Sequence, residues 1–167
     1  KLKFKNSSII YSAGKHRQHG DTIENMQNNI LSMTNLLKAV NPNDINKFIF
    51  LSSAEIYGKI YLKKKIKETS LENPQNYYSL GKLFQEKLLR LHFKSHLKKL
   101  IILRLPGIYG RNDKQTSVIS KIIFNLKNDN YFKLTTNGND IRDYIFVGDL
   151  SKIILLIINS KKINTNN

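Results

Sequence analysis

The 167-residue sequence contains no cysteine, which excludes disulfides, thiolate nucleophiles and cysteine-ligated metal sites. It also has no run of eighteen apolar residues, so the sequence predicts no membrane-spanning helix. The four histidines show no H-E-x-x-H or similar spacing, and we expect no metal site. A cytoplasmic location is consistent with these absences.

Arginine is scarce in a chain that is otherwise strongly basic. The formal net charge is +16, yet only five of the 28 basic residues are arginine, the side chain best suited to bidentate phosphate contacts. Lysine, isoleucine and asparagine make up 65 of the 167 residues, a bias typical of A+T-rich coding. The lysines are scattered along the chain. We therefore expect no specific nucleic-acid partner, only weak nonspecific binding of polyanions.

Two kinds of apolar stretch alternate along the first two thirds of the sequence. Short continuous runs predict buried strands at residues 8–12, 47–53 and 100–104. Helical spacing predicts helices at residues 22–40 and 76–94, with Asp21 as the N-cap of the first. Strands and helices that alternate with short connections are typical of an open α/β layer with a parallel sheet.

The remainder of the chain shows a different pattern. A helix is predicted for residues 117–126, short strands for residues 131–135 and 140–147, and a final helix for residues 147–159. We therefore predict two regions, residues 1–112 and residues 113–167.

The predicted helix at residues 76–94 carries the pattern Y-x-x-x-K. Its apolar residues recur at helical spacing and predict the buried stripe of the helix, namely Leu80, Leu83, Phe84, Leu88 and Leu91. Tyr78, Lys82 and Glu86 share another face. A lysine that lowers the pKa of a neighbouring phenol makes it a usable acid–base group. Gly81 weakens the helix, which indicates that another part of the molecule or a ligand approaches the helix closely at this position. By itself, the pattern also fits an ordinary solvated face with a Lys82–Glu86 pair.

Four motifs in sequence order carry a family resemblance. They are Ser52-Ser53-Ala54-Glu55-Ile56-Tyr57-Gly58, the Tyr78/Lys82/Glu86 set, Leu103-Arg104-Leu105-Pro106-Gly107-Ile108-Tyr109-Gly110, and Arg142-Asp143-Tyr144-Ile145-Phe146-Val147-Gly148-Asp149-Leu150. The stretch Ile9-Ile10-Tyr11-Ser12-Ala13-Gly14 adds a fifth match. Together they resemble the NAD-dependent epimerase/dehydratase family of extended short-chain dehydrogenases/reductases.

The resemblance implies an α/β fold: a partial Rossmann-like, doubly wound parallel sheet over residues 1–112, and part of a small substrate-binding lobe with its following helix over residues 113–167. It implies that Tyr78 is the catalytic acid/base, assisted by Lys82 and Ser53. It implies NAD as cofactor, without excluding NADP. The implied cofactor contacts are Ala13, Gly14, Asn28, Tyr78, Lys82 and Pro106, and the implied substrate contacts are Ser53, Glu55 and Arg142.

The resemblance also bears on the reaction and the partners. Dehydratases of this family have Asp-Glu after the catalytic hydroxyl residue, whereas this chain has Ala54-Glu55, which favours epimerase or reductase chemistry. Gly107 replaces an asparagine that is usual in epimerases, which weakens the case for nucleotide-diphosphate binding, while Arg142 supports it. The implied substrate is a nucleotide-diphosphate sugar, epimerised by transient oxidation and re-reduction. A homodimer through the helix that carries Tyr78 is expected.

Two features favour other interpretations. No Gly-rich G-x-x-G-x-x-G turn occurs, and the sequence begins with Lys1, so we interpret the chain as an internal piece of a longer enzyme that by itself binds cofactor weakly. A sugar-nucleotide reductase or 4,6-dehydratase of the same superfamily is the first alternative function. A non-catalytic remnant or basic binding module is the second.

Overall fold

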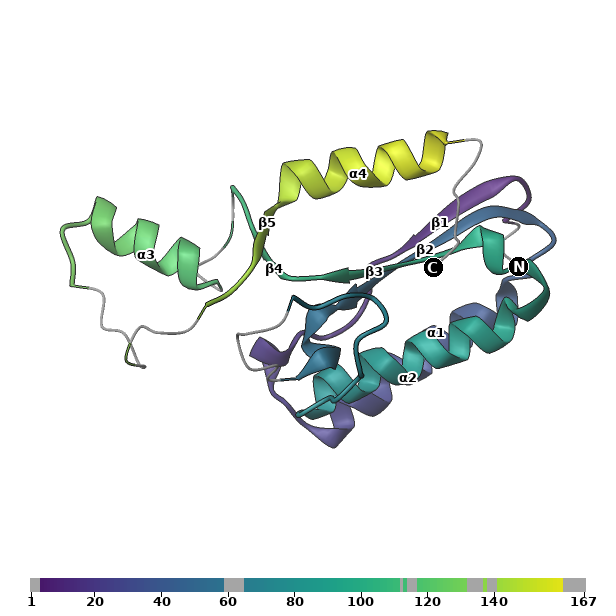
Figure 1. The fold of residues 1–167 in the computed structure, drawn as a ribbon, viewed down its shortest axis with the longest axis horizontal. Helices are drawn as coiled ribbons and strands as arrows, with labels where there is room; N and C mark the ends of the chain where they lie inside the picture. The colour runs from purple at the N-terminus through teal and green to yellow at the C-terminus, as the bar shows by residue number, and fades with distance from the viewer. Residues whose placement is uncertain are drawn as a thin grey trace.

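The protein folds around a three-stranded parallel sheet (Figure 1). The computed structural model describes residues 4–58, 65–111, 113, 117–131, 137 and 141–160. The elements of the sheet region are β1 (Ser7–Tyr11), α1 (Ile23–Ala39), β2 (Ile45–Ser53), α2 (Tyr77–His92) and β3 (Leu100–Leu105). The strand order is β1-β2-β3, and every pairing is parallel. The alternation of strand and helix predicted from the sequence is confirmed.

The central strand β2 is covered on both faces. Phe48, Ile49 and Phe50 are fully buried, as expected for an apolar run in the middle of a parallel sheet. Helices α1 and α2 pack below the sheet as drawn in Figure 1, and α4 (Val147–Asn159) lies above it. The Lys47 ammonium on β2 donates to the carbonyl oxygens of Ile157, Ile158 and Ser160 at the end of α4. A cation at the C-terminal end of a helix satisfies carbonyls that have no partner within the helix.

Helices α1 and α2 contact each other closely at Gly81, as the sequence predicted. A Cβ built on Gly81 would lie 2.9 Å from Cγ of Met26 on α1, so a larger residue there would separate the helices. The predicted N-cap of α1 is wrong by one residue, because Thr22 rather than Asp21 accepts from the Asn25 amide. Asp21 instead accepts the backbone N–H of Tyr78 at 3.0 Å and so ties the start of α2 to the loop before α1.

The predicted buried stripe of α2 is wrong at three of its five positions, while Leu83 and Leu88 are half-buried. Leu80, Phe84 and Leu91 are 45%, 48% and 72% exposed, whereas the buried positions of the helix include Lys82, Gln85 and Glu86. The reason is that the face of α2 that packs against the sheet carries polar groups, and these groups find partners on the strands. Glu86 meets Ser52 and Arg104, and Lys82 meets the backbone of β2.

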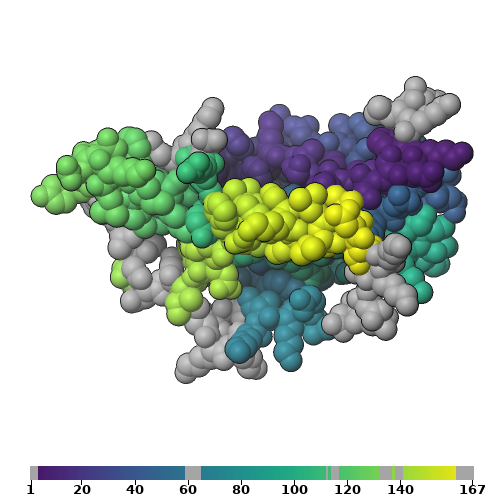
Figure 2. Space-filling view, turned by 90° about the horizontal axis from the view of Figure 1, so that it is seen from above, coloured from purple at the N-terminus to yellow at the C-terminus, as the bar shows by residue number. Residues whose placement is uncertain are grey.

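The C-terminal part contains a second, smaller sheet of two strands. Strands β4 (Gly107–Tyr109) and β5 (Tyr144–Phe146) pair in parallel, and β5 leads directly into α4. Helix α3 (Val118–Lys127) lies at one end of the molecule, away from the three-stranded sheet (Figures 1 and 2). The predicted strand at residues 131–135 lies almost wholly outside the described residues. The predicted division between residues 112 and 113 stays a prediction.

No helix among the described residues is both long and apolar enough to cross a membrane.

Candidate active site

Three loops meet at the carboxyl edge of the parallel sheet. Tyr11 at the end of β1 lies opposite Phe50, and Ser53 at the end of β2 lies opposite Leu105, the last residue of β3. The segments that follow these strands therefore come together at one edge, where open α/β sheets bind ligands. Ala13 and Gly14 follow β1 and are exposed there, and Pro106 follows β3.

Ser53 links the end of β2 to the Y-x-x-x-K helix. Its hydroxyl accepts the Glu55 backbone N–H at 3.2 Å and so caps the 3-10 helix η2 (Ala54–Tyr57). Ser53 also lies close enough to Tyr78 to influence the pKa of its phenol. The structure thus brings the hydroxyl and the phenol to a common point, where both can reach one substrate oxygen.

The pKa of Tyr78 is raised, in contrast to the expectation from the sequence. Burial of the phenol raises it most, and the negative charge of Glu55 raises it further. The neighbouring Ser53 hydroxyl and the positive charge of Arg17 oppose this change. In this structure the phenol of Tyr78 is therefore protonated at neutral pH.

Lys82 lies close to Tyr78 but is directed at the backbone. Its ammonium donates to the Leu51 carbonyl at 2.8 Å and lies 5.8 Å from the centroid of the Tyr78 ring. It also lies 4.9 Å from the centroid of the Phe50 ring. Burial lowers the pKa of Lys82 to about 8, against an opposing effect of Glu86. Lys82 is the nearby cation that the pattern requires, although in this arrangement it does not lower the pKa of the phenol.

Asn29 fixes the loop that follows β1. Its side chain accepts the Lys15 backbone N–H at 2.8 Å and donates to the Lys15 carbonyl at 3.0 Å. Gly14 adopts φ +138°, which is strained for other residues, and a Cβ there would lie 3.2 Å from the Asn29 amide oxygen. Asn28, the predicted cofactor contact, is its exposed neighbour on α1. The pair thus has one buried structural member and one accessible member.

Two residues that belong to none of the motifs influence the surroundings of Tyr78. Arg17 pairs with Glu55, with 3.1 Å between Nη1 and Oε2. The His16 ring lies with its centroid 6.4 Å from that of Tyr78. Partial burial lowers the pKa of His16, and the positive charge of Lys82 and the neighbouring His19 lower it further. No local pattern in the sequence could reveal these contacts, because the loop after β1 meets α2 only in the folded chain.

A buried ion-pair network supports the site from behind. Both carboxylate oxygens of Glu86 accept from Arg104, with 2.7 Å between Nη2 and Oε2, and Glu86 accepts the Ser52 hydroxyl at 2.5 Å. Arg104 also donates to the Tyr57 hydroxyl and to Glu72, each at 2.7 Å. The network connects β2, η2, α2 and β3. Glu86 is therefore a structural anchor and not the solvated partner of Lys82.

Arg142 and Gly107 lie where β5 joins β4. Gly107 pairs with Tyr144 and donates its N–H to the Asp143 carbonyl at 3.2 Å. A Cβ on Gly107 would lie 2.7 Å from the Tyr144 ring, so a larger residue at this position would require the ring to move. Arg142 is exposed just before β5. Its predicted contact with a substrate pyrophosphate stays a prediction.

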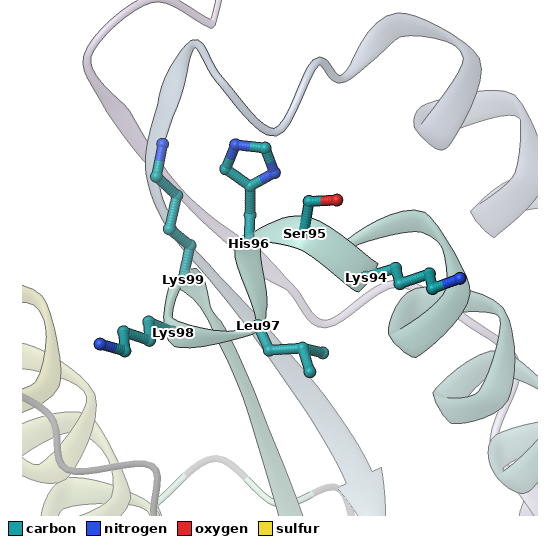
Figure 3. A pocket seen from close by; sticks show the side chains of 6 residues that line it. All are labelled: Lys94, Ser95, His96, Leu97, Lys98 and Lys99. Atoms are coloured by element: carbon teal, nitrogen blue, oxygen red, sulfur yellow. The ribbon is translucent and has the colours of Figure 1, made fainter.

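A basic hollow lies at the opposite end of the sheet, where β3 begins (Figure 3). Its lining residues form the 3-10 helix η3, Lys94–Lys99. Lys99 donates to the Pro42 carbonyl at 2.8 Å and so holds the loop before β2. No group of three or more potential metal-binding side chains occurs within the part of the chain that the structure describes.

The chain belongs to the NAD-dependent epimerase/dehydratase family. The model of that family matches residues 5–166. The predicted family membership and fold class are therefore confirmed, and the family consists of enzymes that depend on NAD.

Individual relatives include both epimerases and dehydratases. A dTDP-D-glucose 4,6-dehydratase of Dictyostelium discoideum is 28% identical over 152 residues, or 85% of this chain and 35% of the relative. A UDP-glucose 4-epimerase of Lacticaseibacillus casei is 28% identical over 156 residues, or 83% of this chain and 46% of the relative. The chain thus spans less than half the length of these curated relatives.

A solved structure shows the same fold. The UDP-N-acetylglucosamine 4-epimerase from Methanobrevibacter ruminantium, in complex with UDP-N-acetylmuramic acid, superimposes with a TM-score of 0.81 at 26% identity. The match covers 93% of this chain and 52% of the solved chain.

Proposed function

We propose that this chain carries the acid–base site of an NAD-dependent nucleotide-sugar epimerase. The observation that carries the proposal is the convergence of Ser53, Tyr78 and Lys82 at the carboxyl edge of the sheet, where the Lys82 ammonium lies 5.8 Å from the centroid of the Tyr78 ring. The exposed Ala13–Gly14 segment lies at the same edge. Membership of the family supports the proposal.

The residues at this edge fit a dinucleotide. Ala13 and Gly14 are small and exposed, so a cofactor can approach the backbone, and Asn28 is accessible on the neighbouring helix. We assign the further cofactor contacts to Tyr78, Lys82 and Pro106. NAD, when bound, takes up and returns a hydride at a sugar carbon.

Tyr78 exchanges the proton that accompanies this hydride. The phenol is protonated in this structure, so it can donate to a keto oxygen during re-reduction, while Ser53 hydrogen-bonds the same oxygen. For oxidation, the phenol must first lose its proton. The Lys82 ammonium is the nearby cation that favours this loss once it turns from the Leu51 carbonyl toward the ligand. We place Glu55 and Arg142 at the nucleotide-sugar substrate.

Epimerisation is favoured over dehydration because of residues 54 and 55. Ala54 has no acidic group to assist the loss of water, and Glu55 accepts hydrogen bonds from Arg17 and Asn76. Both activities occur among the relatives, so the reaction must be tested directly.

The test follows the products of UDP-glucose incubated with the protein and NAD. Nuclear magnetic resonance of the sugar protons distinguishes the outcomes. Inversion at one ring carbon, without net change in NAD, is the expected result. Loss of the C6 hydroxyl would establish the dehydratase alternative. In a parallel incubation with NADH and a keto sugar nucleotide, consumption of NADH without any inversion would establish the reductase alternative. Binding of polyanions without turnover would favour the basic binding module.

We also propose that the outer face of α1 and α2 binds a second copy of the chain. Six apolar side chains on these helices are exposed: Ile23, Leu31, Tyr77, Leu80, Phe84 and Leu91. An apolar surface of this kind is typical of a protein interface. Sedimentation should show a dimer for the native protein and a monomer for Phe84→Ser. A native protein that sediments as a monomer would contradict the proposal.

A cytoplasmic location and the absence of a specific nucleic-acid partner stay predictions from the sequence.

A further inference from the structure

The guanidinium of Arg104 uses all of its N–H donors within the protein. Nε donates to the Glu86 carboxylate, and Nη2 donates to Glu86 and to Glu72, each at 2.7 Å. Nη1 donates to the Tyr57 hydroxyl at 2.7 Å and to the Glu68 carbonyl at 3.0 Å. Because arginine holds its donors in a rigid planar fork, this one side chain fixes four neighbours relative to one another.

Three of these neighbours lie in the two segments that carry the candidate site. Tyr57 ends η2, the short helix that begins directly after Ser53. Glu68 and Glu72 lie in the segment that leads into α2, and Tyr78 is the second residue of that helix. Arg104 on β3 therefore contacts both segments through residues that are not part of the catalytic set.

The two segments are also joined to each other directly. The Asn73 backbone N–H donates to the Ile56 carbonyl at 2.8 Å, and the Asn76 amide donates to the Glu55 carboxylate at 3.2 Å. Asn76 is the N-cap of α2, and its side chain accepts the Ser79 backbone N–H at 2.7 Å. A displacement of η2 would therefore also displace the start of the helix that carries the phenol.

We propose that Arg104 is a positioning residue for the candidate site. It acts through Tyr57 and Glu72. Its effect is to keep the Ser53 hydroxyl and the Tyr78 phenol where both reach one substrate oxygen, so the inference rests on the proposed function. Only 12% of the Arg104 side chain is exposed, and the guanidinium lies 5.1 Å from the centroid of the Tyr57 ring. A catalytic group that is misplaced by about 1 Å can lose about 10²-fold in rate.

The variants that test this role remove single contacts of Arg104 and leave the guanidinium in place. Replacing Arg104 itself would leave the Glu86 carboxylate buried without its partner, and the chain would lose stability for that reason alone. Tyr57→Phe removes the hydroxyl that accepts from Nη1 and keeps the ring. Glu72→Gln removes the carboxylate charge at Nη2 and keeps the length of the side chain.

Each variant has a matched control in the same chain. Tyr11→Phe also removes a hydroxyl from a buried tyrosine, but this hydroxyl donates to Ser32 on α1, at 3.0 Å. Lys87→Gln removes the other cation that contacts Glu72 and leaves the contact between Glu72 and Arg104 intact. Neither control touches the bonds by which Arg104 holds the two segments.

The first measurement is amide hydrogen exchange, followed by nuclear magnetic resonance in the protein without substrate. The reporters are the backbone N–H groups of Glu55, Gly58 and Asn73, whose hydrogen bonds lie within and between the two segments. Tyr57→Phe and Glu72→Gln should speed their exchange by about five- to tenfold, the effect of losing about one hydrogen bond. Exchange in the middle of α1 serves as the reference for global stability, and the two controls should leave the reporters unchanged.

The second measurement is a double-mutant cycle on the turnover of UDP-glucose. In the native background, Tyr57→Phe should lower kcat and kcat/KM alike by about tenfold, because positioning is lost in the transition state. In the Ser53→Ala background the same change should lower kcat by less than about twofold, because the hydroxyl that it positions is already absent. A residue that only stabilises the fold would give the same factor in both backgrounds.

Native exchange rates at all three reporters in Tyr57→Phe would overturn the proposal, and so would equal kinetic factors in the two backgrounds. Effects of the same size in Tyr11→Phe or Lys87→Gln would overturn it as well. If the protein does not turn over UDP-glucose, the proposed function fails, whereas the exchange rates still uphold or overturn the hold of Arg104 on the two segments.

Discussion

The two faces of α2 contrast in a way that reverses the usual amphipathic helix. The inward face buries Lys82, Gln85 and Glu86, while the outward face exposes Leu80, Phe84 and Leu91. Burying charged groups is unfavourable unless every group finds a partner, and here each does: Lys82 donates to Leu51 and Gln85 to the Asn29 carbonyl. Glu86 meets Arg104. The inward face of this helix therefore buries polar groups that position the site, beside Leu89, which is fully buried in the hydrophobic core.

Removal of one network partner should have the largest effect. Glu86→Leu leaves the Arg104 guanidinium without its bidentate partner in a site where only 12% of its side chain is exposed. We expect a loss of about 3–5 kcal/mol in the free energy of unfolding, the range for breaking a buried pair. Chemical denaturation measures it.

Lys87→Gln on the same helix is the matched control for Glu86→Leu. Lys87 pairs with Glu72, but 58% of its side chain is exposed, so its loss should change stability by at most about 1 kcal/mol. If both variants lowered the free energy of unfolding equally, the contrast between the buried and the exposed face of α2 would be refuted.

The second effect is a pH dependence from Lys82. Its pKa is lowered from 10.5 to about 8 in the folded protein, so between these values the unfolded chain binds more protons. Stability therefore rises with pH through that window, and the contribution of Lys82 below pH 8 is unfavourable by about 3 kcal/mol. Chemical denaturation across pH 7–11 measures the free energy of unfolding of the native protein and of Lys82→Met. The difference between the two should show this rise over about two and a half pH units. A constant difference would show that Lys82 titrates as it does in water.

The smallest effect should come from the exposed face. Phe84→Ser removes a ring that is 48% exposed, so the stability of the monomer should change by less than about 1 kcal/mol. The measurement is made at protein concentrations low enough to favour the monomer. A loss as large as that for Glu86→Leu would mean that the face is covered within the chain.

The elements of the fold could be predicted because their signals are local. The apolar runs at residues 47–53 and 100–104 became β2 and β3, and the final helix was predicted with its observed bounds, Val147–Asn159. The direction that α2 faces could not be predicted, because leucine spacing shows which residues share a face but not what that face meets. Only the position of Arg104 on a neighbouring strand decides it.

The candidate site also contains residues that the sequence could predict and residues that it could not. The spacing of Tyr78 and Lys82 and the family resemblance, which adds Ser53, predicted these three residues, and the structure brings them together. Arg17 was missed because its partner Glu55 lies 38 residues away in another loop. Asp21 was assigned as a local cap, but it serves the start of α2 instead. Contacts between separate loops leave no periodic signal in the sequence.

The central claim is that α2 presents Tyr78 as the acid/base group of an NAD-dependent reaction. The most direct test compares Tyr78→Phe with Tyr77→Phe, its exposed neighbour on the same helix, in turnover of UDP-glucose and in binding of NAD. We expect Tyr78→Phe to lose about 10²–10⁴-fold in turnover while NAD still binds, and Tyr77→Phe to retain the native rate. Native turnover in Tyr78→Phe would contradict the account.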